Sequence, residues 1–547
     1  MAKFCEVLKN NFEKYENKRL FLHFEGYQME EAVTYKEFEE RAKKFAGYLQ
    51  SIGSKGERAL ILLPICIDYL TAYVGCLLTQ TISIPLYEVL EENQVADIVK
   101  IINNSDASYI ITDSKSVPKL EECLGDLAED LIFCTIDNFQ EAPYVEKEID
   151  DEDIAYLQYT SGSTKDAKGV KISYKNLYSS CKVMQAHLYL CDSDVFVSWL
   201  PFHFDMGLVG YIANTLFDGA SCCFTSVNGF MKQPDSWLNA ISIYKGTIII
   251  APNFCYEMCG KLPEETLSKM NLSSVRLTIN GSELVRNSTL HKLIDSLEKY
   301  GLSFDSINPS YGLAENTLVV TSHEPHKGYE YITLNEEKLR ENIIEYTESG
   351  LDIVSCGIVC GGVTVKVVGV ENNDVLQDDN IGEIWVAGDS VSEGYWNMDD
   401  EEGFNNTLSN DDNKYFATGD LGFIHDRHLY IVGRKKDMVI IRGKNFYSQD
   451  IEELILNVTK DEVNTAVAFA VDSGEEEELV VIAEILPELF GKGEVIKDKI
   501  KKQISVNCKI VVSNTLLCNV GELPRTDSGK VQRQACKKLY LQGKFKV

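Results

Sequence analysis

The chain has 547 residues, which is too long for one ordinary hydrophobic core, so its length predicts at least two domains. Hydrophobic residues make up 44% and charged residues 25% of the sequence, as is typical of a globular protein. The formal net charge of −31 argues against a nucleic-acid-binding protein, because such a protein needs a basic surface to attract phosphate. The basic segment from Lys530 to Val547 either contacts an acidic partner or is merely solvated.

The remaining composition predicts a cytoplasmic protein without stable membrane insertion. The N-terminus has no long apolar core and is no signal peptide. The most apolar stretch, Ala59 to Leu78, is broken by Pro64 and Asp68 and is too polar to span a bilayer. None of the 16 cysteines forms a Cys-x2-Cys pair, which favours reduced core thiols. Cys255 with Cys259 and Cys356 with Cys360 have helical spacing, but no nearby histidine completes a metal site.

Short apolar runs alternate with helical patterns, and this rhythm predicts an α/β fold with buried parallel strands. It begins with an expected strand from Ala59 to Leu63, a helix from Ile67 to Leu78 and a strand from Ile82 to Leu86. Further strands are predicted from Ser108 to Thr112, Leu131 to Thr135, Ile154 to Tyr159, Thr247 to Ala251, Val275 to Ile279, Gly382 to Ala387 and Leu429 to Val432.

After Lys436 the pattern becomes a compact series of strands and helices. The series predicts a small, separate α+β domain. Its segments are Met438 to Ile441, Gln449 to Val458, Ala466 to Ala470, Leu479 to Ile485, Val495 to Ile504 and Lys509 to Val512.

A loop rich in glycine, hydroxyl groups and lysine follows the predicted strand that ends at Tyr159. Backbone N–H groups, hydroxyls and lysine side chains in such a loop are suited to hold phosphate. The loop is not the P-loop of NTPases, because Ala167 and Gly169 stand where that motif needs Gly and Ser or Thr. Taken alone, it is equally compatible with a solvated surface turn.

Four further segments match, in order, the remaining core motifs of the adenylate-forming enzymes, and the chain resembles this superfamily over essentially its whole length. They are Ser310-Tyr311-Gly312-Leu313-Ala314-Glu315, Tyr415-Phe416-Ala417-Thr418-Gly419-Asp420, Gly433-Arg434-Lys435-Lys436-Asp437 and Pro524-Arg525-Thr526-Asp527-Ser528-Gly529-Lys530. Within the superfamily, the segments from Trp199 to Gly210 and from Ala251 to Phe254 resemble fatty acyl-AMP ligases.

The resemblance implies an α/β fold with a large N-terminal adenylation domain of several subdomains (1–435), a small mobile α+β lid domain (437–547) and a hinge at Lys436. Polar residues Lys435-Lys436-Asp437 between two predicted strands fit such a junction, and a tight hairpin turn is the alternative.

ATP is the implied nucleotide, and Mg²⁺ is the implied metal, because it neutralises charge passing to pyrophosphate. The resemblance assigns Mg²⁺ to Glu315 with help from Thr160; an ordinary helix-start glutamate is the alternative. It assigns the β- and γ-phosphates to Ser161, Gly162, Ser163, Thr164 and Lys168. In this loop the chain departs from the family, because Lys165-Asp166-Ala167 stands where Gly-x-Pro or Thr-x-Pro is common.

By the same resemblance, adenine lies beside Tyr311 and the Gly281-Ser282-Glu283 turn, and Asp420 accepts the ribose hydroxyls with help from Arg434. Lys530, which the lid brings to the α-phosphate and carboxylate, is an expected catalytic residue together with Thr160 and Glu315. The alternatives are that Tyr311 is a core tyrosine, that Asp420 is a solvated aspartate and that Lys530 is an exposed lysine. Ser310, Gly312, Leu313 and Ala314 complete the implied nucleotide site.

The acyl segment reads Phe202-His203-Phe204-Asp205-Met206-Gly207, where the family has an aromatic residue followed by His-Asp-Met-Gly. The shift by one place predicts that the His203 side chain faces the opposite way from the family's histidine and that Phe204 gates the acyl channel. The alternative is that His203 has only a structural role. The implied acyl-site residues are His203, Phe204, Asp205, Met206, Gly207, Gly210 and Phe254, although apolar residues at such spacing are also typical of a plain core.

The segment from Tyr329 to Val354 resembles the insertion that distinguishes acyl-AMP ligases from acyl-CoA ligases. Leu334, Leu339, Ile343 and Ile344 are predicted to pack it onto the large domain and so restrain the small domain. The alternative is a surface loop without influence on the acceptor.

The expected function is therefore ATP-dependent activation of a medium- or long-chain fatty acid and transfer of the acyl group to an acyl carrier protein, such as one of a polyketide or nonribosomal peptide system. An acyl-CoA ligase is the alternative within this chemistry. A non-catalytic nucleotide- or carrier-binding scaffold is the alternative of another class, but the presence of Glu315, Asp420, Arg434 and Lys530 argues against it.

Overall fold

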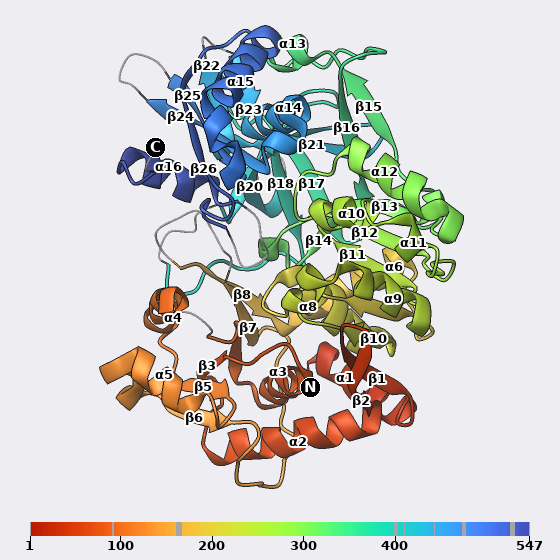
Figure 1. Cartoon of the computed structure of the whole chain (residues 1–547). Coiled ribbons are helices and arrows are strands. Elements are labelled where there is room, and N and C mark those ends of the chain that lie inside the picture. Colours follow the sequence, from red (N-terminus) through yellow and green to blue (C-terminus); the bar gives the residue numbers. More distant parts are fainter. Residues whose placement is uncertain are drawn as a thin grey trace.

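The computed structural model describes residues 2–89, 92–159, 167–398, 403–409, 411–441, 444–472, 477–525 and 531–545. Strands and helices alternate over most of its length, which confirms the predicted α/β class. The smaller C-terminal domain, in blue, lies at one end of the molecule, and the N-terminal segments, in red and orange, lie at the other (Figure 1).

A six-stranded sheet, counted over the described residues, is built from residues 58–173 of the large domain, with the order β6-β5-β3-β4-β7-β8. Its strands pair in parallel except for β7 and β8, which are antiparallel and are joined by the glycine-rich loop. The bounds are β3 Arg58–Ile61, β4 Ile82–Pro85, β5 Tyr109–Thr112, β6 Ile132–Thr135, β7 Ile154–Tyr159 and β8 Gly169–Ser173.

The second sheet of the large domain has 15 strands within the described ranges, in the order β17-β18-β20-β21-β16-β14-β13-β12-β11-β9-β10-β1-β2, with β15 on β16 and β19 on β20. The bounds of its first nine strands are β1 Arg19–Glu25, β2 Gln28–Thr34, β9 Val195–Ser198, β10 Ser221–Phe224, β11 Ile248–Ala251, β12 Leu277–Asn280, β13 Ile307–Gly312, β14 Val319–Ser322 and β15 Tyr331–Leu334. The others are β16 Leu351–Val359, β17 Val363–Val368, β18 Gly382–Gly388, β19 Asn406–Leu408, β20 Asp411–His425 and β21 His428–Arg434.

Only part of this sheet is parallel, from β13 through β12, β11, β9 and β10 to β1. The predicted strands near Gly382 and Leu429 exist, as β18 and β21, but both belong to an antiparallel region. Short turns such as Asp426-Arg427, between β20 and β21, allow antiparallel pairing, whereas parallel pairing needs a crossover. The expectation of parallel strands is therefore wrong for these two.

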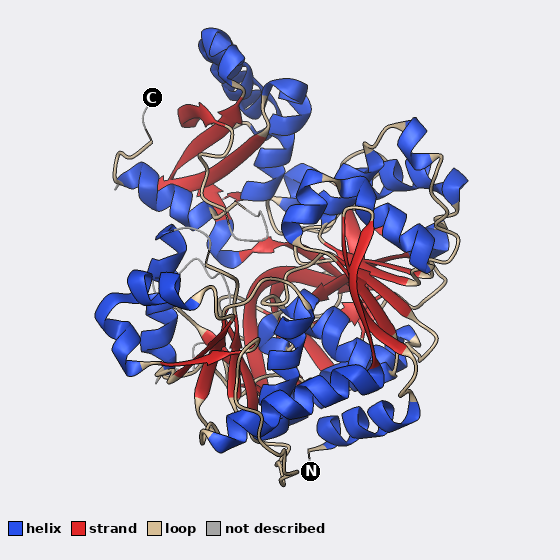
Figure 2. Cartoon of the chain, turned by 60° about the horizontal axis from the view of Figure 1, so that its bottom comes forward, coloured by secondary structure: helices blue, strands red, loops and turns tan. Residues whose placement is uncertain are grey.

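Helices lie against the strands of both sheets (Figure 2). Two of them begin with capping boxes, at Thr34 with Glu37 and at Ser173 with Asn176, which satisfy backbone N–H groups of the first turn. The helices of the large domain are α1 Lys3–Lys14, α2 Tyr35–Ser51, α3 Ile67–Thr79, α4 Glu92–Ser105, α5 Val117–Leu124, α6 Tyr174–Leu188, α7 Asn214–Asp218, α8 Val227–Lys232, α9 Pro234–Tyr244, α10 Asn253–Gly260, α11 Glu264–Leu267, α12 Asn287–Leu297 and α13 Glu336–Leu339.

The small domain has its own apolar clusters. The three-stranded sheet β24-β25-β26 and the hairpin β22-β23 pack with α14 and α15 on one side and α16 on the other. The predicted segment from Lys509 to Val512 is not one element, because Lys509 is the left-handed cap of α15 and β26 starts at Val512. The bounds are β22 Met438–Ile441, β23 Lys444–Tyr447, α14 Ser448–Thr459, β24 Thr465–Asp472, β25 Glu477–Ile485, α15 Gly493–Cys508, β26 Val512–Asn519 and α16 Arg533–Leu541.

The segment resembling the ligase insertion contributes β15 and α13. Leu334 and Leu339 are buried, and Ile344 packs beside them in one apolar cluster with Phe423 of the large sheet. The prediction for Ile343 is wrong, because its side chain is 47% exposed. It directly follows Asn342, whose left-handed φ of 59° turns the chain after α13.

No helix in the described ranges combines the length and the apolar character that a membrane span requires. Across the same residues, no three His, Cys, Asp or Glu side chains lie together as metal ligands. Cys255, Cys259, Cys356 and Cys360 are buried free thiols, so their helical spacing reflects core packing.

Candidate active site

Tyr311, Asp420 and Arg434 form one hydrogen-bonded cluster. Tyr311 Oη donates to Asp420 Oδ2 at 2.6 Å, and Arg434 Nε lies 2.9 Å from Asp420 Oδ1. The Asp420 side chain is nearly buried, whereas that of Arg434 is 53% exposed. Burial and the adjacent carboxylate raise the pKa of Tyr311 well above its ordinary value, so the phenol keeps its proton and donates. The cluster presents a carboxylate whose orientation is fixed from two sides.

The strand register explains why two distant motifs meet at Asp420. β20 and β21 are antiparallel neighbours, and Asp420 lies directly opposite Arg434. Gly419 has a φ of 74°, a left-handed conformation that favours glycine, and its N–H donates to Glu383 Oε1 at 3.2 Å. The predicted partnership of Asp420 with Arg434 is thus a consequence of the sheet.

The carboxyl ends of β11, β12 and β13 meet at one edge of the parallel region, the usual place for a ligand in such sheets. Gly281 follows β12, and a Cβ there would lie 2.9 Å from Ser310 O, so only glycine fits without a shift. The next residue, Ser282, has a φ of 72°, which is uncommon for a non-glycine residue.

Four residues of the Ser310 motif build a turn. Ser310 Oγ lies 2.8 Å from Ser322 Oγ across β13 and β14. A Cβ on Gly312 would lie 2.2 Å from Leu318 O, and Leu313 N donates to the same oxygen at 2.9 Å. Ala314 is buried. This turn presents Glu315.

Glu315 connects the turn to the segment after β18. Tyr395 Oη donates to Glu315 Oε1 at 2.6 Å, and Ser392 N donates to Glu315 O at 2.8 Å. Lys168 Nζ lies 5.1 Å from the centroid of the Tyr395 ring. Lys168 and Glu315, two predicted site residues far apart in sequence, are therefore close to the same tyrosine.

The acyl segment starts a π-helix, η2 Met206–Ala213, with Asp205 at its N-terminus. Gly207 is required here, because a Cβ would lie 1.9 Å from Pro201 O. Met206 is buried, and a Cβ on Gly210 would contact Ile250 and Leu318.

His203 and Phe204 precede this helix with their rings 4.6 Å apart. Burial lowers the pKa of His203 to about 3, so its imidazole is neutral near pH 7. Its ring lies 5.2 Å from that of Tyr87, and its carbonyl accepts from Gln158 Nε2 at 2.6 Å. These contacts favour the structural interpretation of His203.

Phe254 contacts both the predicted adenine turn and Trp199 of the predicted acyl segment. Its backbone N donates to Glu283 Oε1 at 2.7 Å, in the turn that follows Gly281. Its ring lies 5.9 Å from that of Trp199, which stacks on Phe230 at 4.2 Å. Phe254 is only partly buried.

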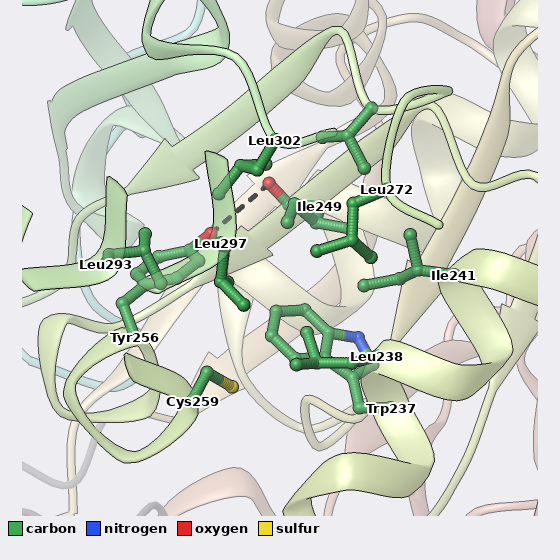
Figure 3. Close-up of a pocket in the computed structure, with 11 residues that line it drawn as sticks. Trp237, Leu238, Ile241, Ile249, Tyr256, Cys259, Leu272, Leu293, Leu297 and Leu302 are labelled. Atoms are coloured by element: carbon green, nitrogen blue, oxygen red, sulfur yellow. Dashed lines mark hydrogen bonds between the residues drawn. The ribbon is translucent and has the colours of Figure 1, made fainter. Parts of the chain in front are cut away.

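A separate apolar cavity lies between α9, α10, α12 and β11 (Figure 3). Trp237, Tyr256 and Leu297 point into it, and Tyr256 Oη donates to Ile249 O at 3.5 Å. The cavity volume of about 10 Å³ is room for no more than one water molecule. It is a packing defect, too small for an acyl chain.

The predicted hinge residue, Lys436, lies between two strands. Lys436 is the middle residue of the short 3-10 turn Lys435–Asp437, which joins β21 of the large sheet to β22 of the small domain. Burial lowers the pKa of Lys436. Thr160, Ser161, Gly162, Ser163, Thr164 and Lys530 lie outside the described residues.

Residues 8–396 match the family of AMP-binding enzymes. The medium-chain-fatty-acid–acyl-carrier-protein ligase JamA of Moorena producens is 34% identical to the chain, over 94% of this chain and 90% of JamA. The chain belongs to the AMP-binding enzyme family.

Two further relatives of this AMP-binding enzyme have names of the same kind. The long-chain-fatty-acid–AMP ligase FadD32 of Mycolicibacterium smegmatis is 30% identical, over 94% of this chain and 90% of FadD32. The crystal structure of a fatty acyl-adenylate ligase from L. pneumophila, in complex with acyl adenylate and pyrophosphate, has a TM-score of 0.77 and 30% identity, covering 99% of this chain and 96% of that one. The predicted membership of the fatty acyl-AMP ligases is confirmed.

Glu315 suits the Mg²⁺ ion that the family implies. Oε1 is held by Tyr395, and Oε2 makes no hydrogen bond or ion pair to the part of the chain that the structure describes. Mg²⁺ in nucleotide sites takes one or two carboxylates and completes its shell with phosphate oxygens and water. A single oriented carboxylate is therefore enough for a metal that arrives with ATP.

The sequence motifs missed Tyr395, Thr317 and Ser390. Thr317 has a φ of 64°, unusual for a β-branched residue, and its Oγ1 donates to Ser390 O at 2.7 Å. Ser390 Oγ donates to Asn316 Oδ1 at 2.9 Å, directly after Glu315. These bonds hold the Glu315 turn to the segment that carries Tyr395. A strained residue beside a motif is visible only in the structure.

Tyr395→Phe removes the hydroxyl that orients Glu315. We expect the KM for MgATP to rise about three- to tenfold, because an orienting hydrogen bond contributes about 0.5–1.5 kcal/mol and about 1.4 kcal/mol is a factor of ten. Raising free Mg²⁺ should recover part of the loss, because the defect lies in metal placement. Pyrophosphate release at several Mg²⁺ concentrations tests this. A KM that is unchanged would remove Tyr395 from the site.

Proposed function

We propose that the chain activates a medium- or long-chain fatty acid with ATP and transfers the acyl group to the thiol of an acyl carrier protein. The Asp420 cluster carries the nucleotide part of the proposal, because Tyr311, which donates to Asp420, directly follows Ser310, whose carbonyl lies against Gly281. The names of JamA and FadD32 both support a fatty acid substrate, and the name of JamA also supports the carrier protein.

In the first step, an oxygen of the fatty acid carboxylate attacks the α-phosphorus of ATP. A new O–P bond forms, the bond to the bridging oxygen breaks, and pyrophosphate leaves with the electron pair. Two anions meet, so cations and fixed dipoles must stabilise the added charge. In the second step, the carrier thiolate attacks the acyl carbonyl carbon, a thioester forms, and AMP leaves.

The residues take the following roles. Asp420 accepts the ribose hydroxyls, Arg434 and Tyr311 hold that carboxylate, and the Gly281-Ser282 turn contacts adenine. Glu315 would hold Mg²⁺, which when bound neutralises charge on the phosphates. Phe204, Gly210 and Phe254 line the acyl side. Thr160 to Thr164 with Lys168 bind the β- and γ-phosphates, and Lys530 stabilises the charge at the α-phosphate.

We place the domain boundary at Lys436, with an adenylation domain over 1–435 and a lid over 437–547. One large apolar cluster lies wholly before Lys436 and another wholly after it, which supports this division. All 16 cysteines are free thiols, which supports a reducing compartment and hence the cytoplasm.

Contacts of the insertion favour a carrier protein over free coenzyme A. Arg340 O accepts from Asn445 N at 3.0 Å, its Nη1 donates to Asn507 O at 3.4 Å, and its guanidinium lies 5.2 Å from the Phe446 ring. Glu337 pairs with Lys509. Each of these contacts joins the insertion to the small domain. Rotation of the small domain must break these contacts, so the contacts restrain the rotation.

A hairpin variant tests the restraint. Leu334 lies directly opposite Leu351 on β15 and β16, so replacing residues 335–350 by Asn-Gly closes a two-residue turn without changing the register. With ATP, Mg²⁺, fatty acid and free coenzyme A, we expect the intact enzyme to make acyl-adenylate and little acyl-CoA, and the variant at least about tenfold more acyl-CoA.

Arg340→Met is the matched point variant, since it removes the guanidinium contacts and keeps the insertion; its acyl-CoA yield should lie between the two. Abundant acyl-CoA from the intact protein would make it an acyl-CoA ligase. No acyl-CoA from the hairpin variant would mean that the insertion does not choose the acceptor.

The main test of the activity is pyrophosphate release across a series of fatty acids of increasing length, with the product captured as acyl-adenylate. We expect a maximum at medium or long chains. A flat response across all acids would contradict fatty acid activation.

A further inference from the structure

Arg533, at the start of α16, has a nearly buried guanidinium that contacts two carboxylates. Nη2 lies 2.8 Å from Glu452 Oε2, Nε lies 3.0 Å from Glu452 Oε1, and Nη1 lies 2.8 Å from Asp437 Oδ2. The three side chains are only 13–16% exposed. Such a planar fork holds both partners in a defined geometry, as lysine cannot.

One of these carboxylates belongs to the residue directly after the hinge. Asp437 Oδ1 also accepts from Gln534 Nε2 at 3.3 Å, and Asp437 O accepts from Ser448 Oγ at 2.7 Å. Asp437 is therefore bonded to α14 and to α16, both of the small domain, within one residue of Lys436.

The other carboxylate lies inside the small domain. Glu452 is on α14, and its Oε1 also accepts from Ala468 N of β24 at 2.9 Å. Burial raises the pKa of Glu452, and Arg533 partly offsets this. One guanidinium thus joins the residue after the hinge, two helices and a strand.

We propose that Arg533 is a positioning residue, which fixes Asp437 to the body of the small domain so that the domain turns about Lys436 as one unit. The inference rests on the proposed two-step reaction, in which the lid must adopt defined orientations. Without the Arg533 bond to Asp437, the rotation of the small domain is distributed over several residues of β22. The lid then reaches the reacting atoms in many orientations. The chemical step then slows while ATP binding persists.

Asp437→Asn is the decisive variant, because it weakens the bond to the hinge and leaves the Arg533–Glu452 pair in place. We expect kcat for pyrophosphate release to fall about tenfold or more, with the KM for ATP nearly unchanged. Arg533→Lys should show the same split between kcat and KM. Lys499→Gln is the control, since it removes another ion pair of the small domain, 2.5 Å long to Glu462, that involves none of residues 434–437.

Hydrogen exchange gives a readout that does not depend on activity. Amides of residues 437–441 should exchange faster in Asp437→Asn than in the native protein and in Lys499→Gln, while the melting temperature stays within a few degrees. Unchanged exchange, or an unchanged kcat in an enzyme that releases pyrophosphate, would overturn the proposal. Faster exchange in a chain that activates no fatty acid would support the Arg533 role and refute the proposed function.

Discussion

Asp420→Ala is expected to weaken ATP binding by about ten- to a hundredfold without unfolding the protein. Hydrogen bonds between a carboxylate and the ribose hydroxyls are worth about 1.5–3 kcal/mol, and about 1.4 kcal/mol is a factor of ten in affinity. These contacts exist in the ground state, so binding itself should weaken. Arg434 loses its partner at little cost, because its half-exposed side chain is solvated. Isothermal titration with ATP measures the effect.

Asp411→Ala is the matched control for this experiment. Asp411 lies on the same strand, β20, and accepts from Tyr415 Oη at 2.6 Å, just as Asp420 accepts from Tyr311. Losing that pair should leave ATP affinity unchanged. Equal weakening in both variants would point to distortion of β20, and full affinity in Asp420→Ala would disprove the ribose contact.

The strands of the fold were predictable because each is a short apolar run between turns. β7 and β22 have the predicted bounds, and the helix predicted from Ile67 to Leu78 is α3. Pairing was less predictable. β20 has 15 residues that mix polar and apolar side chains, and its register depends on turns and on neighbours far away in sequence.

The candidate site likewise contains residues that the sequence motifs predicted and residues that they did not. Asp420, Arg434 and Tyr311 belong to motifs, and the sheet brings them together. Tyr395 belongs to no motif, and its contact with Glu315 depends on the hydrogen bonds between the segment after β18 and β8. The π-helix at Met206 was also missed, because a run of eight apolar and small residues does not reveal which hydrogen-bond period it adopts.

Lys530→Ala is expected to lower kcat for adenylate formation by at least about a hundredfold, as for loss of a group that stabilises charge only in the transition state. The KM for ATP should change little, because the lysine contributes nothing to the ground-state complex. The fold should persist, since the residues flanking this segment are held independently of Lys530. Gln532 N donates to Pro524 O at 2.8 Å, and Arg525 pairs with the buried Glu484 at 2.6 Å.

Two further variants separate charge from position. Lys538→Ala removes an exposed lysine of the same domain and should leave turnover unchanged. Lys530→Arg keeps the charge but replaces a compact ammonium by a larger planar group, so most of the activity should remain lost. Pyrophosphate release, ATP titration and thermal melting are measured on all three proteins. Native turnover in a folded Lys530→Ala protein would exclude the lysine from the reaction, and full recovery in Lys530→Arg would mean that net positive charge, not its placement, is what the transition state requires.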